Sequence, residues 1–424
     1  MDPTTYPGVG SDIQQRDPAA CLPIPPAPAD ALADAPEHSA LDWTRRLIEF
    51  DTTSRESNLG LIETVRDHFV AQGLKPHLSY NPQRNKANLH VIVPAADGSE
   101  QRGIVLSGHT DVVPVDGQDW STDPFRPALR DGRLYGRGAC DMKGFIGTSL
   151  ALLPTLLQAR LREPVHYALS FDEEVGCMGA PYLIDDLRER GIQPAGCIVG
   201  EPTSMRVIVA HKGINAYRCC VKGQAAHSSL TPRGVNAIEY AARLICFIRD
   251  LADEFRAKGP YDDAFDVPFT TASTGTIQGG IALNTIPALC EFVFEYRNLP
   301  GVDPEAIRAR IEAYANDVLL PRMRAEHADA GLSITRIAAA PALDAAERDA
   351  ITQLVRALTG DNAISKVAYA TEGGLFQRAG IPAVVCGPGD IQQAHKADEF
   401  VALEQLAQCE AFLHKVVDSL RLAA

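Results

Sequence analysis

The chain is poor in aromatic residues and in the cysteine pairs that build bridges or metal sites. Only 6% of its 424 residues are aromatic, two of them tryptophan, and its ten cysteines include no C-x-x-C pair. So few aromatic side chains offer no stacking platform for single-stranded nucleic acid. So few cysteines at this length argue against a disulfide scaffold, and we therefore expect a reducing, cytoplasmic location.

Excess basic charge and long apolar runs are also lacking. Lys and Arg number 40 against 54 Asp and Glu, which gives a formal charge of −14. This balance argues against a nucleic-acid partner, which normally meets a basic face, and against a polybasic membrane anchor. The longest apolar runs are shorter than the ~18 residues that a membrane span needs. Neither a Gly-x4-Gly-Lys-Ser/Thr phosphate loop nor a Gly-x-Ser-x-Gly elbow occurs.

The first 38 residues differ in composition from the rest. They contain eight prolines and have neither a basic start nor a continuous apolar stretch, so we expect no signal peptide. Frequent proline blocks helix formation, and we predict a flexible or draped arm over residues 1–38. The length of the chain suggests two or three domains.

Two parts of the chain alternate helical segments with short, unbroken apolar runs. Runs of that kind suit strands buried on both faces, as in a sheet covered by helices. The pattern therefore predicts an α/β domain. The predicted strands are 89–93, 104–107, 166–171, 197–199 and 383–386, and the predicted helices include 41–50, 59–73 and 144–159.

The middle of the chain follows another order. Its predicted elements run β-α-β-β-α-β, which is the ferredoxin-like arrangement of a small independent domain. We predict that this domain, residues 212–338, is inserted into the first one, which consists of residues 39–211 and 339–424.

Five segments place histidine or acidic side chains directly after a predicted strand. In an open α/β sheet, ligands gather beyond the carboxyl ends of the strands. Several carboxylates converging there would repel one another unless cations compensated their charge. Two histidines with three or more carboxylates suit a pair of divalent transition metals, and imidazole suits zinc. The segments are Gly108–Asp111, Gly138–Asp141, Asp172–Glu174, Gly200–Pro202 and Gln393–Lys396.

Each of these segments has an ordinary structural explanation when taken alone. A single His or Asp at a strand end is more often a cap or a turn residue than a ligand. The pair Glu173-Glu174 alone would suit a solvated turn, and Cys140 suits a small buried side chain better than a nucleophile. The coincidence of five such segments favours a metal site.

The same segments resemble the signatures of the acetylornithine deacetylase / succinyl-diaminopimelate desuccinylase family of dizinc amidohydrolases. They occur in the family's order, and the resemblance covers about residues 40–420. It implies a mixed-sheet, metallopeptidase-like catalytic domain with an inserted lid and dimerisation domain, and hence a homodimer. The matching stretches are 108–114, 136–144, 172–176, 200–203 and 394–399.

The resemblance also implies a ligand set for two divalent ions, zinc or alternatively cobalt. Asp141 would bridge the two ions. His109 and Glu201 would complete the protein ligands of one ion, and Glu174 and His395 those of the other.

Further roles follow from the resemblance for three residues that are not ligands. Glu173 would be the general base, which moves a proton from water to the leaving amine. Asp111 would accept the free ring N–H of His109 and fix its tautomer. His227 would reach across a dimer to the oxyanion, although a surface histidine at a helix start is the simpler alternative.

Substrate contacts are implied at four positions. Asn284 and Arg297 match positions that hold the substrate's α-carboxylate, and the planar fork of arginine suits that task. Gly373 and Gly374 could offer backbone N–H groups to the ligand. An ordinary surface ion pair at Arg297 and a tight turn at the two glycines are the alternatives.

The reaction implied by the resemblance is hydrolysis of the amide of a small N-acyl amino acid. N2-acetyl-L-ornithine, cleaved to ornithine and acetate in arginine biosynthesis, is the expected substrate. Succinyl-diaminopimelate or another acyl-amino acid is the alternative within the family. A single-metal enzyme and a non-catalytic metal- or ligand-binding scaffold also stay open, although the intact Glu173 argues against the scaffold.

Overall fold

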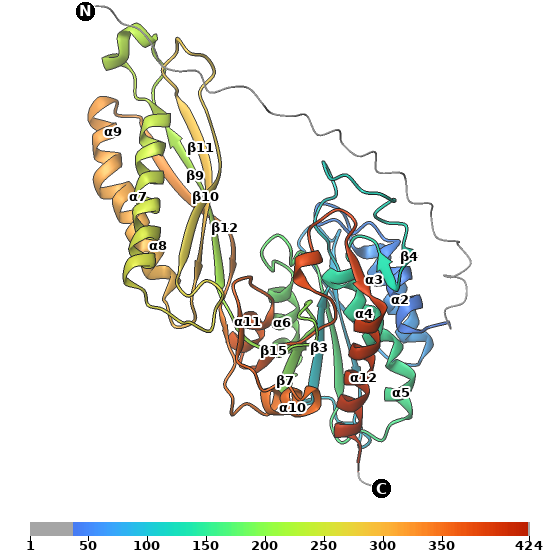
Figure 1. The fold of residues 1–424 in the computed structure, drawn as a ribbon. Helices are drawn as coiled ribbons and strands as arrows, with labels where there is room; N and C mark the ends of the chain where they lie inside the picture. The colour runs from blue at the N-terminus through green and yellow to red at the C-terminus, as the bar shows by residue number, and fades with distance from the viewer. Residues whose placement is uncertain (1–36, 423–424) are drawn as a thin grey trace, which may run out of the picture.

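A computed structural model describes residues 37–422, so the predicted arm at 1–38 lies outside the described residues apart from its last two. The described chain forms a larger part around a mixed sheet and a smaller part around a separate sheet (Figure 1). Within residues 37–422, no helix combines the length and the apolar character needed to cross a membrane.

A nine-stranded mixed sheet organises the larger part. Its four central strands, β6, β3, β7 and β15, run parallel, and antiparallel strands flank them on both sides. This arrangement confirms the predicted mixed α/β class. The order is β1 (His77–Tyr80), β2 (Ala87–Val93), β6 (Val165–Ser170), β3 (Ile104–His109), β7 (Gly196–Val199), β15 (Ala383–Val385), β8 (Ile208–His211) and β13 (Leu343–Asp344), with β14 (Ser365–Val367) also pairing with β8.

Helices cover both faces of this sheet because successive strand residues point to opposite sides. In β3, Ile104 and Leu106 join the core on one face, whereas Val105 joins the core on the other. The first face carries α2 (Ala40–Ile48), α3 (Leu59–Ala71), α4 (Gly144–Ala151), α5 (Leu153–Gln158), α10 (Ala350–Thr359) and α12 (Leu403–Leu420). The second face carries α6 (Ala180–Glu189) and α11 (Gly373–Arg378).

One predicted helix is divided in the structure. The segment 144–159 forms α4 and α5, which meet at Leu152, instead of one continuous helix. Pro154 lies in the first turn of α5, where its missing N–H costs nothing. A helix continuing through that position would lose a backbone hydrogen bond, which explains why a new helix starts there.

The smaller part has the predicted β-α-β-β-α-β order and a hydrophobic core of its own. Its antiparallel sheet has the order β10, β11, β9, β12, and its helices cover one face (Figure 1). The chosen boundaries, 212 and 338, stay a prediction. The elements are β9 (Gly213–Lys222), α7 (Ala237–Lys258), β10 (Thr271–Gly279), β11 (Leu289–Asn298), α8 (Pro304–Ala313), η3 (Tyr314–Leu319), α9 (Leu320–Glu326) and β12 (Gly331–Ala340).

A third, small sheet joins distant parts of the sequence. It consists of β16 (Phe400–Ala402), β5 (Arg133–Tyr135) and β4 (Ala128–Arg130), paired antiparallel in that order. Next to it, the backbone N–H of Gly136 donates to the carbonyl of Glu399 at 2.9 Å. The sheet therefore holds the segment before Asp141 against the segment after His395.

Candidate metal centre

Three neighbouring parallel strands deliver the first acidic and histidine side chains to one edge of the main sheet. His109 is the last residue of β3, Glu173 and Glu174 follow β6, and Glu201 follows β7. Because β6, β3 and β7 are adjacent and parallel, their carboxyl ends meet. Gly200 is required here, since a Cβ on it would lie 1.9 Å from the ring of Phe145.

The other two predicted ligands arrive by a different route. Asp141 lies in η1 (Ala139–Lys143), before α4, at a kink where its own backbone is not helical (φ −119°, ψ 93°), and His395 follows the short helix η4 (Ile391–Gln393). The prediction that all five segments directly follow strands of the sheet is therefore wrong for these two. A kinked segment at Asp141 and a loop at His395 replace the strand end.

Asp141 lies between the two histidines. Its Oδ1 is 2.9 Å from Nε2 of His109, and its Oδ2 is 3.4 Å from Nε2 of His395. Each histidine also has a second acidic neighbour. Nε2 of His109 is 3.6 Å from Oε1 of Glu201, and Nε2 of His395 is 3.0 Å from Oε2 of Glu174. The structure thus brings all five predicted ligands together, with the two oxygens of Asp141 facing opposite sides.

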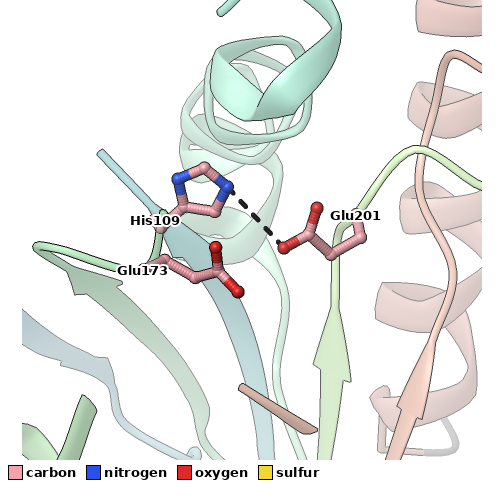
Figure 2. A group of neighbouring side chains, drawn as sticks. All are labelled: His109, Glu173 and Glu201. Carbon is pink, nitrogen blue, oxygen red and sulfur yellow. Dashed lines mark ion pairs between the residues drawn. The ribbon is translucent and has the colours of Figure 1, made fainter. Parts of the chain in front are cut away.

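Glu173 belongs to the same cluster. Its carboxylate lies beside His109 and faces Glu201 (Figure 2). Two sets of three side chains place one potential ligand atom each within 4.8 Å of one another: His109, Glu173 and Glu201 in one, and His109, Asp141 and Glu174 in the other. Geometry alone therefore allows Glu173 to approach a cation as well as a water molecule.

Asp111 holds the backbone that carries Glu173 and Glu174. Its carboxylate accepts hydrogen bonds from the hydroxyl of Ser54 at 2.7 Å and from the backbone N–H groups of Glu173 and Glu174 at 3.0 and 3.2 Å. Nδ1 of His109 is 3.0 Å from the backbone carbonyl of Asp111 but 3.5 Å from its carboxylate. The shorter contact of the imidazole is thus with the carbonyl, while the carboxylate mainly holds the turn of the two glutamates.

Carboxylates outnumber imidazoles in this buried cluster, and their proximity shifts their pKa values. Burial, together with the neighbouring carboxylates and against the opposing charge of His109, raises the pKa values of Glu173 and Glu201 well above the ordinary range. Burial and the nearby Asp141 raise the pKa of Glu174 to about 7. Hydrogen bonds to Asp141 and Glu174 raise the pKa of His395 to about 10. Divalent cations would relieve this repulsion, and two imidazoles with several carboxylates form a donor set that zinc accepts.

Glu399 fixes the position of Asp141 through the backbone. One of its carboxylate oxygens accepts from the N–H groups of Cys140 and Asp141 at 2.8 and 3.0 Å. The other accepts from the N–H of Gly138 at 3.0 Å and from Arg137 at 2.7 Å. Glu399 and Arg137 lie within the quoted signatures, but the sequence assigned neither a role, because only their contact shows it.

Lys86 is a second supporting residue that the sequence did not indicate. Its ammonium donates to the carboxylate of Asp172, directly before the two glutamates, and both side chains are largely buried. A lone lysine before a strand carries no motif, so nothing in the sequence pointed to this pair.

Two predicted residues lie in the smaller domain. His227 precedes η2 (Ser228–Arg233), and the β10–β11 connection contains Asn284; both segments lie at the end of this domain remote from the main sheet (Figure 1). The N–H of Ser228 donates to the carbonyl of Asn284 at 3.0 Å, which ties the two segments together. Nδ1 of His227 accepts from the N–H of Ser229 at 3.2 Å. Within one chain, the structure does not bring these residues to the cluster of candidate ligands.

The other predicted substrate contacts have partners already. Arg297 forms an ion pair with Glu295 at 2.9 Å on the sheet of the smaller domain. Gly373 donates its N–H to the hydroxyl of Thr371 at 3.0 Å. A Cβ on Gly374 would lie 2.2 Å from the carbonyl oxygen of Pro341, so this glycine serves a close approach to the segment after β12.

Comparisons with known proteins point to one family. Residues 105–419 match the model of peptidase family M20/M25/M40. The chain is 36% identical to the acetylornithine deacetylase of Myxococcus xanthus over 88% of its length and 94% of the relative's. It is 32% identical to the acetylornithine deacetylase of Pasteurella multocida (strain Pm70), over 90% of the chain and 96% of the relative.

A solved structure shows the same fold. The M20 family metallo-carboxypeptidase Sso-CP2 from Sulfolobus solfataricus superposes with a TM-score of 0.69 at 16% identity, over 89% of this chain and 98% of that one. The family model and the two relatives confirm the family resemblance inferred from the five signatures. The chain belongs to the peptidase family M20/M25/M40 and is a metallohydrolase of that family.

Proposed function

We propose that this protein is a dimetal amidohydrolase that removes the acyl group from N-acyl amino acids, with N2-acetyl-L-ornithine as its substrate. The observation that carries the proposal is the convergence of two histidines and three further carboxylates around Asp141, in a chain whose relatives over most of their length are named acetylornithine deacetylase. The products would be ornithine and acetate.

The arrangement around Asp141 supports two cation positions. Each of its carboxylate oxygens faces one histidine, so Asp141 is suited to bridge two ions. His109 and Glu201 lie on one side of it, and His395 and Glu174 on the other. When bound, zinc or cobalt would polarise the amide carbonyl and lower the pKa of water toward about 7.

Glu173 is the residue best placed to move the proton. It lies within the cluster, and its backbone is held by Asp111, so its carboxylate can take a proton from the attacking water and deliver it to the nitrogen of the leaving amine. Glu174, the next residue, contacts His395 and is thereby committed to the ligand set. In this proposal Glu173 transfers the proton and Glu174 is a metal ligand.

A homodimer would complete the site. Ile281 and Leu283, in the β10–β11 connection, are 90% and 102% exposed, and such apolar exposure is typical of interaction surfaces. Because Nδ1 of His227 accepts a hydrogen bond, a neutral ring carries its proton on Nε2, where it can be donated to an oxyanion. We assign that oxyanion to the partner subunit's site. Asn284 and Arg297 would bind the substrate's α-carboxylate. Arg297 would then give up its ion pair with Glu295 and form one with the substrate.

A substrate panel tests the proposal. The purified protein should hydrolyse N2-acetyl-L-ornithine with a higher kcat/KM than acetylcitrulline, acetylmethionine or succinyl-diaminopimelate. Metal content measured on the same preparation should approach two ions per chain. A preference for the succinyl compound would contradict the substrate assignment, and full activity at one ion per chain would contradict the dimetal assignment.

A further inference from the structure

The backbone after Glu173 forms a tight turn that is closed by hydrogen bonds between its own main-chain groups. The N–H groups of Gly176 and Cys177 both donate to the carbonyl of Glu173, at 2.9 and 2.8 Å, and the N–H of Met178 donates to the carbonyl of Asp172 at 2.9 Å. Cys177 adopts a positive φ of 56°, which a residue with a side chain rarely takes. The backbone thus brings the fourth residue after Glu173 next to it.

A thiol meets the carboxylate at this point. Sγ of Cys177 lies 3.3 Å from Oε1 of Glu173, and Cys177 is only 3% exposed. An ordinary cysteine has a pKa of about 8.5, so its thiol is protonated at neutral pH and can donate, whereas Glu173 in the ionised form that acts as the base can only accept. The direction of the hydrogen bond is therefore from Cys177 to Glu173.

Such a bond matters because the last torsion of a glutamate side chain is soft. The carboxylate can rotate over a broad range of angles, and a base is effective only when one oxygen points at the proton that it takes. A hydrogen-bond donor that holds one of the two oxygens restricts the range of angles over which the carboxylate rotates. In the structure the carboxylate faces His109 and Glu201 while Oε1 is held by the thiol (Figure 2).

We propose that Cys177 is a positioning residue for the general base: its thiol donates a hydrogen bond to Oε1 of Glu173 and fixes the rotation of that carboxylate toward the ligand cluster. The proposal rests on the proposed function, in which Glu173 transfers the proton. Other buried cysteines, such as Cys409 in α12, fill space in the hydrophobic core. Cys177 differs from them because its sulfur touches a group that the reaction uses.

Two substitutions separate hydrogen bonding from packing. Cys177→Ala removes the donor, and we expect kcat for N2-acetyl-L-ornithine to fall about fivefold to tenfold, with KM and metal content unchanged. Cys177→Ser keeps a donor on a similar backbone, and we expect it to restore at least half of the lost kcat. The matched control is Cys409→Ala, which removes a fully buried thiol from α12 and should leave kcat as it is.

The outcomes distinguish this proposal from the proposed function. Equal kcat values for the Ala and Ser variants, or a loss confined to KM or metal content, would overturn the role of Cys177 while leaving the hydrolase assignment intact. A wild-type protein that hydrolyses no member of the substrate panel would overturn both.

A spectroscopic measurement serves if the alanine variant does not fold. The S–H stretching band of Cys177 is obtained as the Raman difference between the wild type and Cys177→Ser. Glu173→Gln replaces the charged acceptor by a weaker neutral one, so the band should move to higher frequency. A band at the same position in both backgrounds would show that the thiol does not donate to Glu173, and would overturn the proposal.

Discussion

The carboxylate of Glu399 accepts a hydrogen bond from the backbone N–H of Asp141 at 3.0 Å, although the two residues are 258 positions apart in the sequence. The same carboxylate forms a buried ion pair with Arg137, and both side chains are 1% exposed. A residue from the end of the chain therefore holds the residue that we propose to bridge the two cations.

We expect Glu399→Gln to weaken both the fold and metal retention. The amide keeps the size of the side chain but leaves the charge of Arg137 buried without a counter-charge, which costs about 3 kcal/mol. The melting temperature should fall, and EDTA should remove metal faster than from the wild type. Glu404→Gln, on the exposed first turn of α12, is the matched control. An unchanged melting temperature and an unchanged rate of metal loss would show that the contacts of the Glu399 carboxylate are not needed.

Glu173→Gln should abolish turnover without emptying the centre. A general base contributes about 10²–10⁴ in rate, so we expect kcat to fall by that factor while two ions per chain are retained. Activity and metal content are measured on one preparation, with Glu189→Gln at the exposed end of α6 as the control. If instead metal content fell in step with kcat, Glu173 would be acting as a ligand, which the geometry of its group also allows.

Metal binding should release protons. The protein's own groups raise the pKa of His395 to about 10, so this ring is protonated at neutral pH until a cation displaces the proton. Apparent zinc affinity should therefore rise with pH between about 6 and 9. Calorimetric titration of the metal-depleted protein in buffers of different ionisation enthalpy counts the protons released. His395→Ala should release fewer, and an equal count would contradict this account.

His211 should make the fold sensitive to acid. It is completely buried, and burial lowers its pKa to about 4, against about 6.5 in an unfolded chain. Between these values the unfolded state binds more protons, so stability falls as the pH drops below about 6.5, by about 2 kcal/mol at pH 5. The loss of melting temperature between pH 7 and pH 5 should therefore be smaller in His211→Gln. The half-exposed His414→Gln is the control, and identical losses in wild type and His211→Gln would refute the prediction.

A mixing experiment tests the dimer. If His227 acts in the partner subunit's site, Glu173→Gln and His227→Ala proteins are each inactive alone, but a heterodimer contains one intact site. Random exchange should then restore about a quarter of wild-type activity, because half of the dimers are mixed and half of their sites are complete. Mixing each variant with itself is the control. Failure to recover activity after demonstrated subunit exchange would place His227 outside the reaction.

Sequence reasoning reached the fold class and the cluster of candidate ligands because both follow from local patterns. A buried strand followed by His109 or Glu201 is visible in a short window, and three such strand ends meet at one edge of the sheet. The routes by which Asp141 and His395 arrive were predicted wrongly, because neither directly follows a strand of that sheet. The division of the helix around Pro154 was missed because the apolar pattern runs on through the proline.

The supporting contacts could not be predicted in the same way. Lys86 meets Asp172 across 86 positions, and Glu399 reaches Asp141 across 258, so neither pair has a spacing that a motif could reveal. The contact between Cys177 and Glu173 is local, but it depends on a positive φ at a non-glycine residue, which propensities do not anticipate.

Because His395 and Glu399 follow the other residues of the site in the sequence, synthesis imposes an order of events. A nascent chain that stops before residue 395 already contains the three strand-end segments with His109, Glu174 and Glu201, and also the whole smaller domain with its own core. It lacks His395 and the carboxylate of Glu399, which accepts the hydrogen bond from the backbone of Asp141. The smaller domain can therefore fold on the ribosome, whereas the complete set of candidate ligands assembles only after residues 395–399 have been made.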